Sequence, residues 1–229
     1  MKKITLALCF CLIAGQLLAV PKSSAPTITN TPITEHAADY ELELNCPTVK
    51  WPQNSRVQRL VNRRIAALVM RDKTIFMRNR QKPFNNFNNG LTLNYQVINA
   101  TAKRLSLKFN ALVYYAGAAH PQHWVETLNF DLATGGELSL ADACAAGPAY
   151  LATLSRICIQ DLLGRKELQL DKGWVKQGAG PDLSNFQCFN LTETGLIITF
   201  PEYQVAPYAV GELEVSIPLN LLQKRSEPL

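Results

Sequence analysis

The chain has 229 residues, of which 47% are hydrophobic and 18% are charged, and its formal net charge is +5. This composition excludes a disordered chain, a collagen-like chain and a coiled coil. The length suits one domain, or two small ones that share a core.

The first residues have the pattern of a secretory signal peptide. Lys2 and Lys3 precede an apolar run, residues 4–20. We expect cleavage after Ala19, so that residues 1–19 are removed and the mature chain is exported, to the periplasm or the extracellular space. A membrane anchor is the competing interpretation. The run is at the short end of what a spanning helix needs, so no transmembrane anchor is expected.

Four cysteines follow the signal peptide: Cys46, Cys144, Cys158 and Cys188. An even number in an exported chain predicts two disulfides. We favour Cys144 with Cys158, because a short loop can close on a following helix, and Cys46 with Cys188 by default. Zinc binding is the alternative, but the chain has no Cys-x-x-Cys or Cys-x-x-His pair.

Positive charge is concentrated in residues 50–82, which contain ten Lys or Arg and one acid, Asp72. Arg56, Arg59 and Arg63 fall on one side of a predicted helix there. They can form a contact surface for an anionic envelope polymer, or simply a solvated helix face. No nucleic acid is expected as a partner, because aromatic residues do not interleave with the basic ones.

Residues 20–38 are rich in Pro, Ser and Thr, and we expect them to form a flexible lead. Residues 39–224 are then expected to form one α+β domain. Its N-terminal part, residues 39–100, and its C-terminal part, residues 101–224, would share one core.

Apolar and polar residues alternate in several segments, as in strands with one buried face. Glu126 lies on the apolar face of its segment and requires a partner there. Asn89-Gly90 predicts a turn. The strand segments are residues 40–46, 91–97, 104–113, 124–130, 186–191, 196–200 and 212–217.

Two amphipathic helices are expected among these strands. The first begins at Pro52 and ends before Pro83, since the residue before a proline avoids the helical region. The second begins at Gly147-Pro148 and ends near Gly164, and residues 165–184 look irregular. The predicted fold class is α+β, a mostly antiparallel sheet covered by two main helices.

Three stretches resemble a known family when taken together. They are Tyr-Ala-Gly-Ala-Ala-His-Pro at 115–121, the segments 128–135 and 138–142, and the segments 200–211 and 215–219. In this order they resemble the extracytoplasmic domain of the bacterial anti-sigma-V factor. They also resemble the non-catalytic N-terminal half of peptidoglycan deacetylase C. The resemblance covers roughly residues 40–222.

That resemblance implies an α+β domain outside the cytoplasm that binds rather than catalyses. The anti-sigma factor binds host lysozyme, so a lysozyme-like protein or a cell-wall glycan is the implied partner. No sigma-binding segment and no deacetylase domain are recognised in this chain, so neither activity is carried over.

We expect the ligand to be bound by two segments, the loop 117–124 and the segment 203–208, because aromatic residues and prolines on rigid loops are typical contact groups. The predicted binding residues are Gly117, His120, Pro121, His123, Trp124, Tyr203, Pro207 and Tyr208.

No catalytic motif is recognised, and no metal or cofactor is expected. His120 and His123 are too few for a zinc site, and His120 is expected to hydrogen-bond the backbone of its own turn. The alternative is an envelope hydrolase for glycan or ester bonds. It requires two or more of His120, Asp131, Asp142 and Glu202 within hydrogen-bond reach in one pocket. Asp131 and Asp142 stand where turn and helix-cap acids are common.

Overall fold

The computed structural model describes residues 24–85, 87–144, 150–166, 170–218 and 220–221. The predicted signal peptide lies outside this range. Among the described residues, no helix has the length and apolar character needed to cross a membrane.

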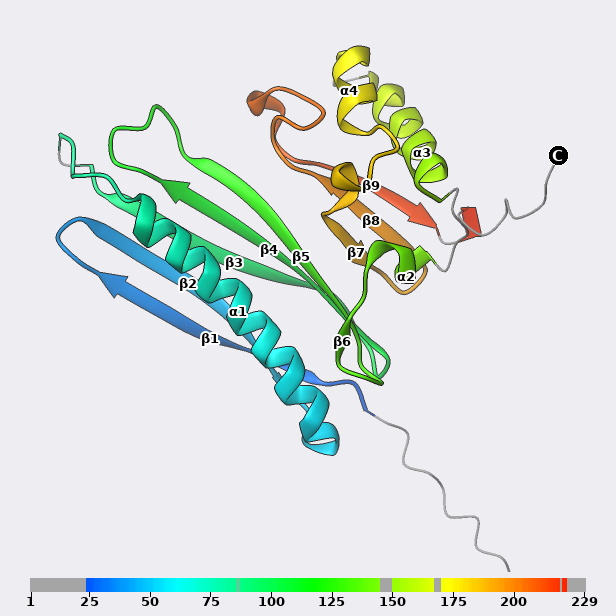
Figure 1. Ribbon diagram of the computed structural model, residues 1–229, viewed down its shortest axis with the longest axis horizontal. Helices are drawn as coiled ribbons and strands as arrows, with labels where there is room; N and C mark the ends of the chain where they lie inside the picture. The colour runs from blue at the N-terminus through cyan, green and yellow to red at the C-terminus, as the bar shows by residue number, and fades with distance from the viewer. Residues whose placement is uncertain (1–23, 86, 145–149, 167–169, 219, 222–229) are drawn as a thin grey trace, which may run out of the picture.

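A six-stranded sheet forms the first unit of the fold, with the strands in sequence order (Figure 1). All neighbouring strands are antiparallel except β2 and β3, which are parallel because α1 crosses over between them. The elements are β1 (Thr27–His36), β2 (Tyr40–Lys50), α1 (Ser55–Asn79), β3 (Asn89–Ala100), β4 (Arg104–Tyr114), β5 (Gln122–Asp131) and β6 (Gly136–Glu137).

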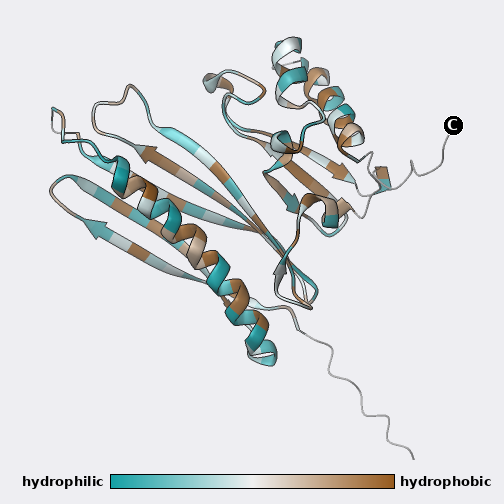
Figure 2. Cartoon of the chain, viewed as in Figure 1, coloured by the Kyte–Doolittle hydropathy of each residue, from teal (hydrophilic) through white to brown (hydrophobic). Residues whose placement is uncertain are grey.

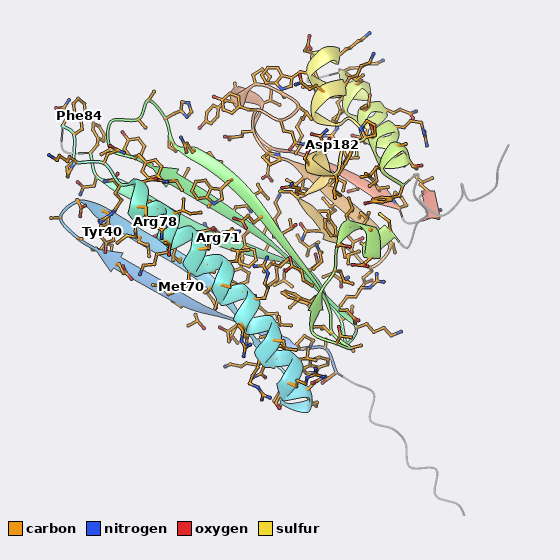
Figure 3. All side chains as sticks on the ribbon, in the orientation of Figure 1. Tyr40, Met70, Arg71, Arg78, Phe84 and Asp182 are labelled. Atoms are coloured by element: carbon orange, nitrogen blue, oxygen red, sulfur yellow. The ribbon has the colours of Figure 1, made fainter. Side chains whose placement is uncertain are left out.

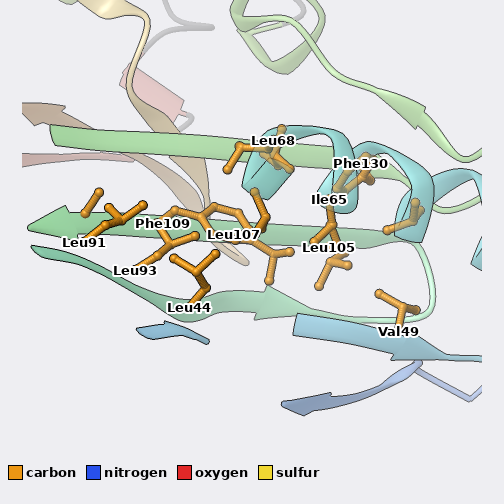
Figure 4. Packing of buried hydrophobic residues seen from close by; sticks show 14 of the residues in the cluster. Leu44, Val49, Ile65, Leu68, Leu91, Leu93, Leu105, Leu107, Phe109 and Phe130 are labelled. Carbon is orange, nitrogen blue, oxygen red and sulfur yellow. The ribbon is translucent and has the colours of Figure 1, made fainter. Parts of the chain in front are cut away.

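Helix α1 covers one face of this sheet, as its apolar stripe predicts. Asn54 caps it by accepting a hydrogen bond from the backbone N–H of Val57 at 3.2 Å. The stripe residues Val61, Ile65 and Leu68 are buried against the alternate side chains of β2 to β5. Figure 4 shows this packing, with Ile65 and Leu68 on the helix above Leu107 and Phe109.

A second unit follows, built on a three-stranded antiparallel sheet with the order β7-β8-β9. Helices α3 and α4 lie on the side of that sheet that faces away from the first unit (Figure 1). The elements are α2 (Leu140–Cys144), α3 (Tyr150–Gly164), α4 (Lys172–Gly178), β7 (Phe189–Leu191), β8 (Gly195–Phe200) and β9 (Leu213–Pro218). Figure 2 shows polar and apolar residues alternating along many of the strands.

The predicted α+β fold class is confirmed, but the buried core is divided into two parts. The buried apolar residues form two clusters, one under α1 and one under α3 and α4, where a single shared core was predicted. The boundary falls between β6 and α2 and not near residue 100, because β3, β4 and β5 pair side by side in one sheet.

Three local predictions were wrong. Residues 27–36 of the expected flexible lead form the edge strand β1, paired along its length with β2. The segment 165–184 contains α4, which Asp171 caps by accepting from the N–H of Trp174 at 2.7 Å. Asn89 is a buried strand residue and not part of a turn.

The charge of Glu126 on the apolar face of β5 is explained by α1. Arg71 reaches from the helix and forms an ion pair with Glu126, and it bonds Asp72 at 2.8 Å as well. Burial raises the pKa of Glu126, and the guanidinium of Arg71 opposes that rise. The arginine is therefore the partner that the sequence pattern required.

Polar side chains join the two units. Ser106 and Asn129 lie on the face of the first sheet opposite α1, and the Ser106 hydroxyl donates to Asn129 Oδ1 at 2.7 Å. Asn129 Nδ2 donates to the carbonyl of Phe189 at 2.8 Å, and the N–H of Leu191 donates to Asn129 Oδ1 at 3.0 Å. Asn190 Nδ2 donates to Ser106 Oγ at 2.8 Å. Strand β7 is thus held to the first sheet by buried hydrogen bonds.

Lys108 extends this interface toward β9. Its side chain is 3% exposed, and its ammonium group pairs with Glu212 and, at 2.6 Å, with Glu214. Burial alone lowers the pKa of Lys108, but the two carboxylates outweigh it and the pKa lies above its usual value. The lysine is therefore charged at neutral pH, and its charge is balanced from the second unit.

Candidate functional site

An aromatic cluster forms where the two segments predicted to bind the ligand meet. We use this name for His120, His123, Tyr203 and Tyr208. The ring centroids of His120 and Tyr208 are 4.5 Å apart, and those of Tyr203 and Tyr208 are 5.8 Å apart. The centroid of the His123 ring lies 6.4 Å from that of Tyr208. Tyr203 is 54% exposed and both histidines are exposed, so the cluster presents open ring surface.

The first of the two loops is held at both ends. Gly117 has φ +86°, a conformation that favours glycine, and it begins the loop. Just before it, the N–H of Ala116 donates to Oδ1 of buried Asn89 at 3.1 Å. At the far end, the Tyr208 hydroxyl donates to the carbonyl of Pro121 at 3.4 Å.

His120 is placed by its own turn, as expected. Its Nδ1 lies 2.7 Å from the carbonyl oxygen of Pro121, and because that oxygen can only accept, the ring donates from Nδ1. The ring also lies beside that of Tyr208. The histidine is therefore held by its turn while its side chain stays exposed to solvent.

Helix α4 fixes the second loop. Trp174 Nε1 donates to the carbonyl of Tyr203 at 3.0 Å. Gln204 Nε2 donates to the carbonyls of Gly178 and Asn185, at 2.8 and 2.9 Å. The backbone approach is so close that a Cβ on Gly178 would lie 1.8 Å from the carbonyl oxygen of Gln204. Sequence reasoning missed these supports, although Asp171 three residues before Trp174 is a helix-cap spacing.

Trp124 does not belong to the aromatic cluster. It pairs with Ala111 on the α1 face of the sheet, and its ring packs against the core of the first unit. Because side chains alternate along β5, its neighbour His123 points to the opposite face, toward the second unit. Pro207 is exposed and stands immediately before Tyr208.

A cleft of about 280 Å³ lies next to the aromatic cluster, between β4 and β5 on one side and the second unit on the other. It offers amide, imidazole and carboxylate groups together. Its lining consists of Asn110, Ala111, His123, Trp124, Val125, Pro201, Glu202 and Glu212.

The acids proposed for a hydrolase do not converge. Asp131 Oδ1 accepts from the N–H of Ala133 at 2.8 Å in the turn after β5. Asp142 Oδ2 accepts from the Ser139 hydroxyl at 2.6 Å and from its N–H at 3.0 Å. These hydrogen bonds lower the pKa of Asp142. Both acids lie at the opposite end of β5 from His120, so only Glu202 reaches the cleft, and the expected turn and cap roles are confirmed.

All four described cysteines are free thiols in the structure. Cys46 packs on the α1 side of the first sheet, whereas Cys188 donates to the carbonyl of Val125 at 3.2 Å, on the side of the second unit. The sheet separates them, so the Cys46–Cys188 pairing was wrong. Cys144 and Cys158 share the second core, and their pairing stays a prediction. Among the described residues, no group of three or more His, Cys, Asp or Glu could hold a metal ion.

The basic residues of α1 divide into paired and unpaired sets. Arg64 forms an ion pair with Glu137 at 2.6 Å, and Arg71 pairs with Glu126. Arg56, Arg59 and Arg63 are exposed and form no ion pair within the described ranges. Three unpaired arginines thus lie on the N-terminal half of the helix, whereas Arg78 lies in its last turn.

Comparison with known proteins shows similarity to one family model and to two curated proteins. Residues 142–220, most of the second unit, match the family "Protein of unknown function (DUF3298)". The chain is 30% identical over 135 residues to the peptidoglycan-N-acetylmuramic acid deacetylase PdaC of Bacillus subtilis, a match that covers 59% of this chain. It is 26% identical over 109 residues to an esterase of Mycobacterium tuberculosis, covering 46% of this chain. The matches span 29% and 45% of the lengths of these two relatives.

Solved structures extend the similarity of fold to nearly the whole chain. A DUF3298 family member from Bacteroides fragilis superposes with a TM-score of 0.66 at 16% identity, covering 88% of this chain and 94% of the other. A DUF3298 family protein from Pseudomonas aeruginosa superposes with a TM-score of 0.60 over the same shares, also at 16% identity. The comparisons support the resemblance to the deacetylase and give none to the anti-sigma-V factor. Residues 142–220 of this chain therefore match the DUF3298 family model, and the chain shares the α+β fold of solved DUF3298 proteins.

Proposed function

We propose that this chain is an exported domain of the bacterial envelope that binds cell-wall glycan and has no catalysis of its own. The observation that carries the proposal is the convergence of the loop 117–124 and the segment 203–208 into one exposed aromatic cluster beside a polar cleft. The bond from the Tyr208 hydroxyl to the carbonyl of Pro121 joins these two segments, and Trp174 of α4 bonds the carbonyl of Tyr203.

The chemistry of the cluster and cleft suits a sugar. Aromatic rings with polar edges present flat apolar faces on which the C–H faces of sugar rings can pack. Asn110, Glu202 and Glu212 supply amide and carboxylate groups that bond hydroxyls and acetamides. The similarity to a peptidoglycan deacetylase supports peptidoglycan as the source of that glycan, and the signal-peptide pattern supports export.

Calorimetry of the chain from residue 20 onward, titrated with soluble peptidoglycan fragments, tests the proposal. We expect binding that Tyr208→Ala and His120→Ala each weaken about 10-fold or more, which is about 1.4 kcal/mol. His36→Ala is the matched control, since His36 is an exposed histidine on β1, away from the cluster. Absence of heat with every fragment contradicts the proposal. A titration with lysozyme in parallel tests the protein partner that the family resemblance implies.

A second candidate is an envelope hydrolase, which the similarity to an esterase favours. Among the described residues, no serine hydroxyl hydrogen-bonds either histidine of the cluster, so a serine nucleophile there lacks its base. Hydrolysis of a p-nitrophenyl ester that Glu202→Gln or His123→Ala abolishes, with folding intact, would favour this candidate over a binding domain.

A further inference from the structure

A second cavity lies far from the aromatic cluster, in a groove between α1 and the hairpin of β1 and β2. Its volume is about 260 Å³. Figure 1 shows β1 and β2 running alongside the helix, and Figure 3 shows Met70 on the side of α1 that faces them. The groove is lined by Thr31, Ile33, Cys46, Pro47, Thr48, Asn62, Ile65, Ala66, Val69 and Met70.

The floor of the groove is chemically apolar, because its polar side chains are bonded within the protein. Asn62 Oδ1 accepts from the N–H of Val49 at 2.8 Å, and Asn62 Nδ2 donates to the carbonyl of Val49 at 2.9 Å. The hydroxyls of Thr31 and Thr48 bond each other at 2.8 Å. A polar ligand such as a sugar would find few free partners here, whereas an alkyl chain would contact Ile33, Ile65 and Val69 along with the methylenes of Met70.

The rim of the groove is positively charged at one end. Residues seven apart on an α-helix lie on the same face. Arg59 precedes Ala66 by seven positions, and Arg63 precedes Met70 by seven, so both arginines flank the groove toward the start of the helix. At the other end Lys73 is neutralised by Glu35 of β1. Of the charged side chains that flank the groove, Arg59 and Arg63 are therefore the unpaired ones, and they lie at the end nearer the start of α1.

We propose that this groove binds an anionic amphiphile, with the alkyl chain between α1 and β1 and the phosphate or carboxylate head group on Arg59 and Arg63. The apolar floor requires the chain, and the unpaired arginines require the charge, so neither a neutral detergent nor a simple polyanion satisfies the whole site. A fatty acid and an anionic lipid share this chemistry. This site is separate from the aromatic cluster and does not depend on the proposed glycan binding.

Cys46 provides a direct reporter of occupancy, because its thiol lines the groove. The rate at which N-ethylmaleimide alkylates Cys46 is measured by peptide mass spectrometry, with and without decyl phosphate below its micellar concentration. We expect decyl phosphate to slow alkylation of Cys46 at least 5-fold and to leave Cys188, on the other side of the sheet, unchanged. Decyl maltoside and polyphosphate, which have only the chain or only the charge, should protect Cys46 far less.

Two variants on exposed alanines of α1 separate a groove from a general effect. Ala66→Trp fills the groove and should weaken the binding of decyl phosphate at least 10-fold. Ala67→Trp adds the same ring outside the lining and should leave binding unchanged. The double variant Arg59→Ser, Arg63→Ser should weaken binding to a similar extent, whereas Arg78→Ser, at the far end of the helix, should leave it unchanged. Phosphatidylglycerol vesicles distinguish the two sources of the ligand. The protein should bind the vesicles if the ligand is a membrane lipid, and should not bind them if it is a free amphiphile.

Three results would overturn the proposal. One is that decyl phosphate leaves Cys46 alkylation unchanged in the wild-type chain. Another is that both tryptophan variants behave alike. The third is that polyphosphate binds as tightly as decyl phosphate, since the arginines would then form the anionic-polymer surface considered from the sequence.

Discussion

The ring centroids of His120 and Tyr208 lie 4.5 Å apart. The Tyr208 hydroxyl also donates a hydrogen bond to the carbonyl of Pro121, a residue 87 positions earlier in the sequence. The contact connects the loop after β4 with the turn before β9. It therefore depends on the two units being held in register by the polar interface between β4, β5 and β7.

The first prediction concerns that interface. Asn129→Ala removes one acceptor for Ser106 and Leu191 and one donor to Phe189, all in buried surroundings. Because the partners are left unsatisfied, we expect the free energy of unfolding to fall by roughly 2–4 kcal/mol, measured by urea denaturation. Asn94→Ala is the control, since Asn94 is exposed and accepts a single side-chain bond from Asn45. Equal losses from the two variants would contradict the role given to Asn129.

The second prediction concerns the support of the 203–208 segment by α4. Gly178→Ala places a methyl group against the backbone of Gln204, which must move. We expect a loss of about 1–3 kcal/mol in the free energy of unfolding and weaker glycan binding in the same variant. Gly164→Ala, at the end of α3 where a Cβ meets nothing within 4 Å, should change neither by much. A stable Gly178→Ala protein with unaltered binding would show that the segment does not need this contact.

The third prediction concerns oxidation of the cysteines. Both Cys144 and Cys158 are buried in the second core, and closing the short chain between them should stabilise the fold by about 3 kcal/mol. Peptide mapping without reductant is expected to find Cys144 linked to Cys158 and to find Cys46 and Cys188 free. A Cys46–Cys188 peptide, or four free thiols in protein taken from the envelope, would contradict this expectation.

The fourth prediction concerns the reduced protein at alkaline pH. Burial raises the pKa of the Cys158 thiol to about 12, from a usual value of 9.0. The folded state therefore keeps its proton where the unfolded chain loses it. The contribution of this thiol to the free energy of unfolding is complete below pH 9. It is lost as the pH rises toward 12, with a slope of about 1.4 kcal/mol per pH unit.

Urea denaturation at several pH values between 8 and 11, in the presence of a reductant, measures this slope. Cys158→Ala should make the curve shallower by the contribution of one thiol, and Cys46→Ala should change it less, because Cys46 is only partly buried. The same slope in the wild type and in Cys158→Ala would show that this thiol does not titrate in the way proposed.

Much of the fold follows from local patterns in the sequence. The spacing of Val57, Val61, Ile65 and Leu68 determined α1 and the face it buries, because helical periodicity places those residues on one stripe. Alternation determined β4, β5 and β9 in the same way, and Leu213, Val215 and Ile217 are the buried residues of β9, as expected. Of the eight residues predicted to bind the ligand, the structure brings four together in the aromatic cluster: His120, His123, Tyr203 and Tyr208.

Other features depended on partners that lie far along the chain. Residues 27–36 were predicted to be flexible because they are mostly polar. They form a strand because they pair with the edge of β2. Asn89 reads as a turn residue, yet its amide bonds the backbone of Asp39, Gln81 and Ala116, which only the folded chain brings together. Likewise, the support that Trp174 and Gly178 give to Tyr203 and Gln204 has no local signal.

The sequence by itself determined the fold class, the helix and strand faces and the segments that carry the aromatic cluster, because these depend on neighbours within a few residues. Tertiary structure decided the number of cores, the separation of Cys46 from Cys188, the scattering of Asp131 and Asp142 away from His120, and the groove beside α1. Each of these depends on which face of a sheet a residue occupies and on what covers that face, and long-range packing alone sets that.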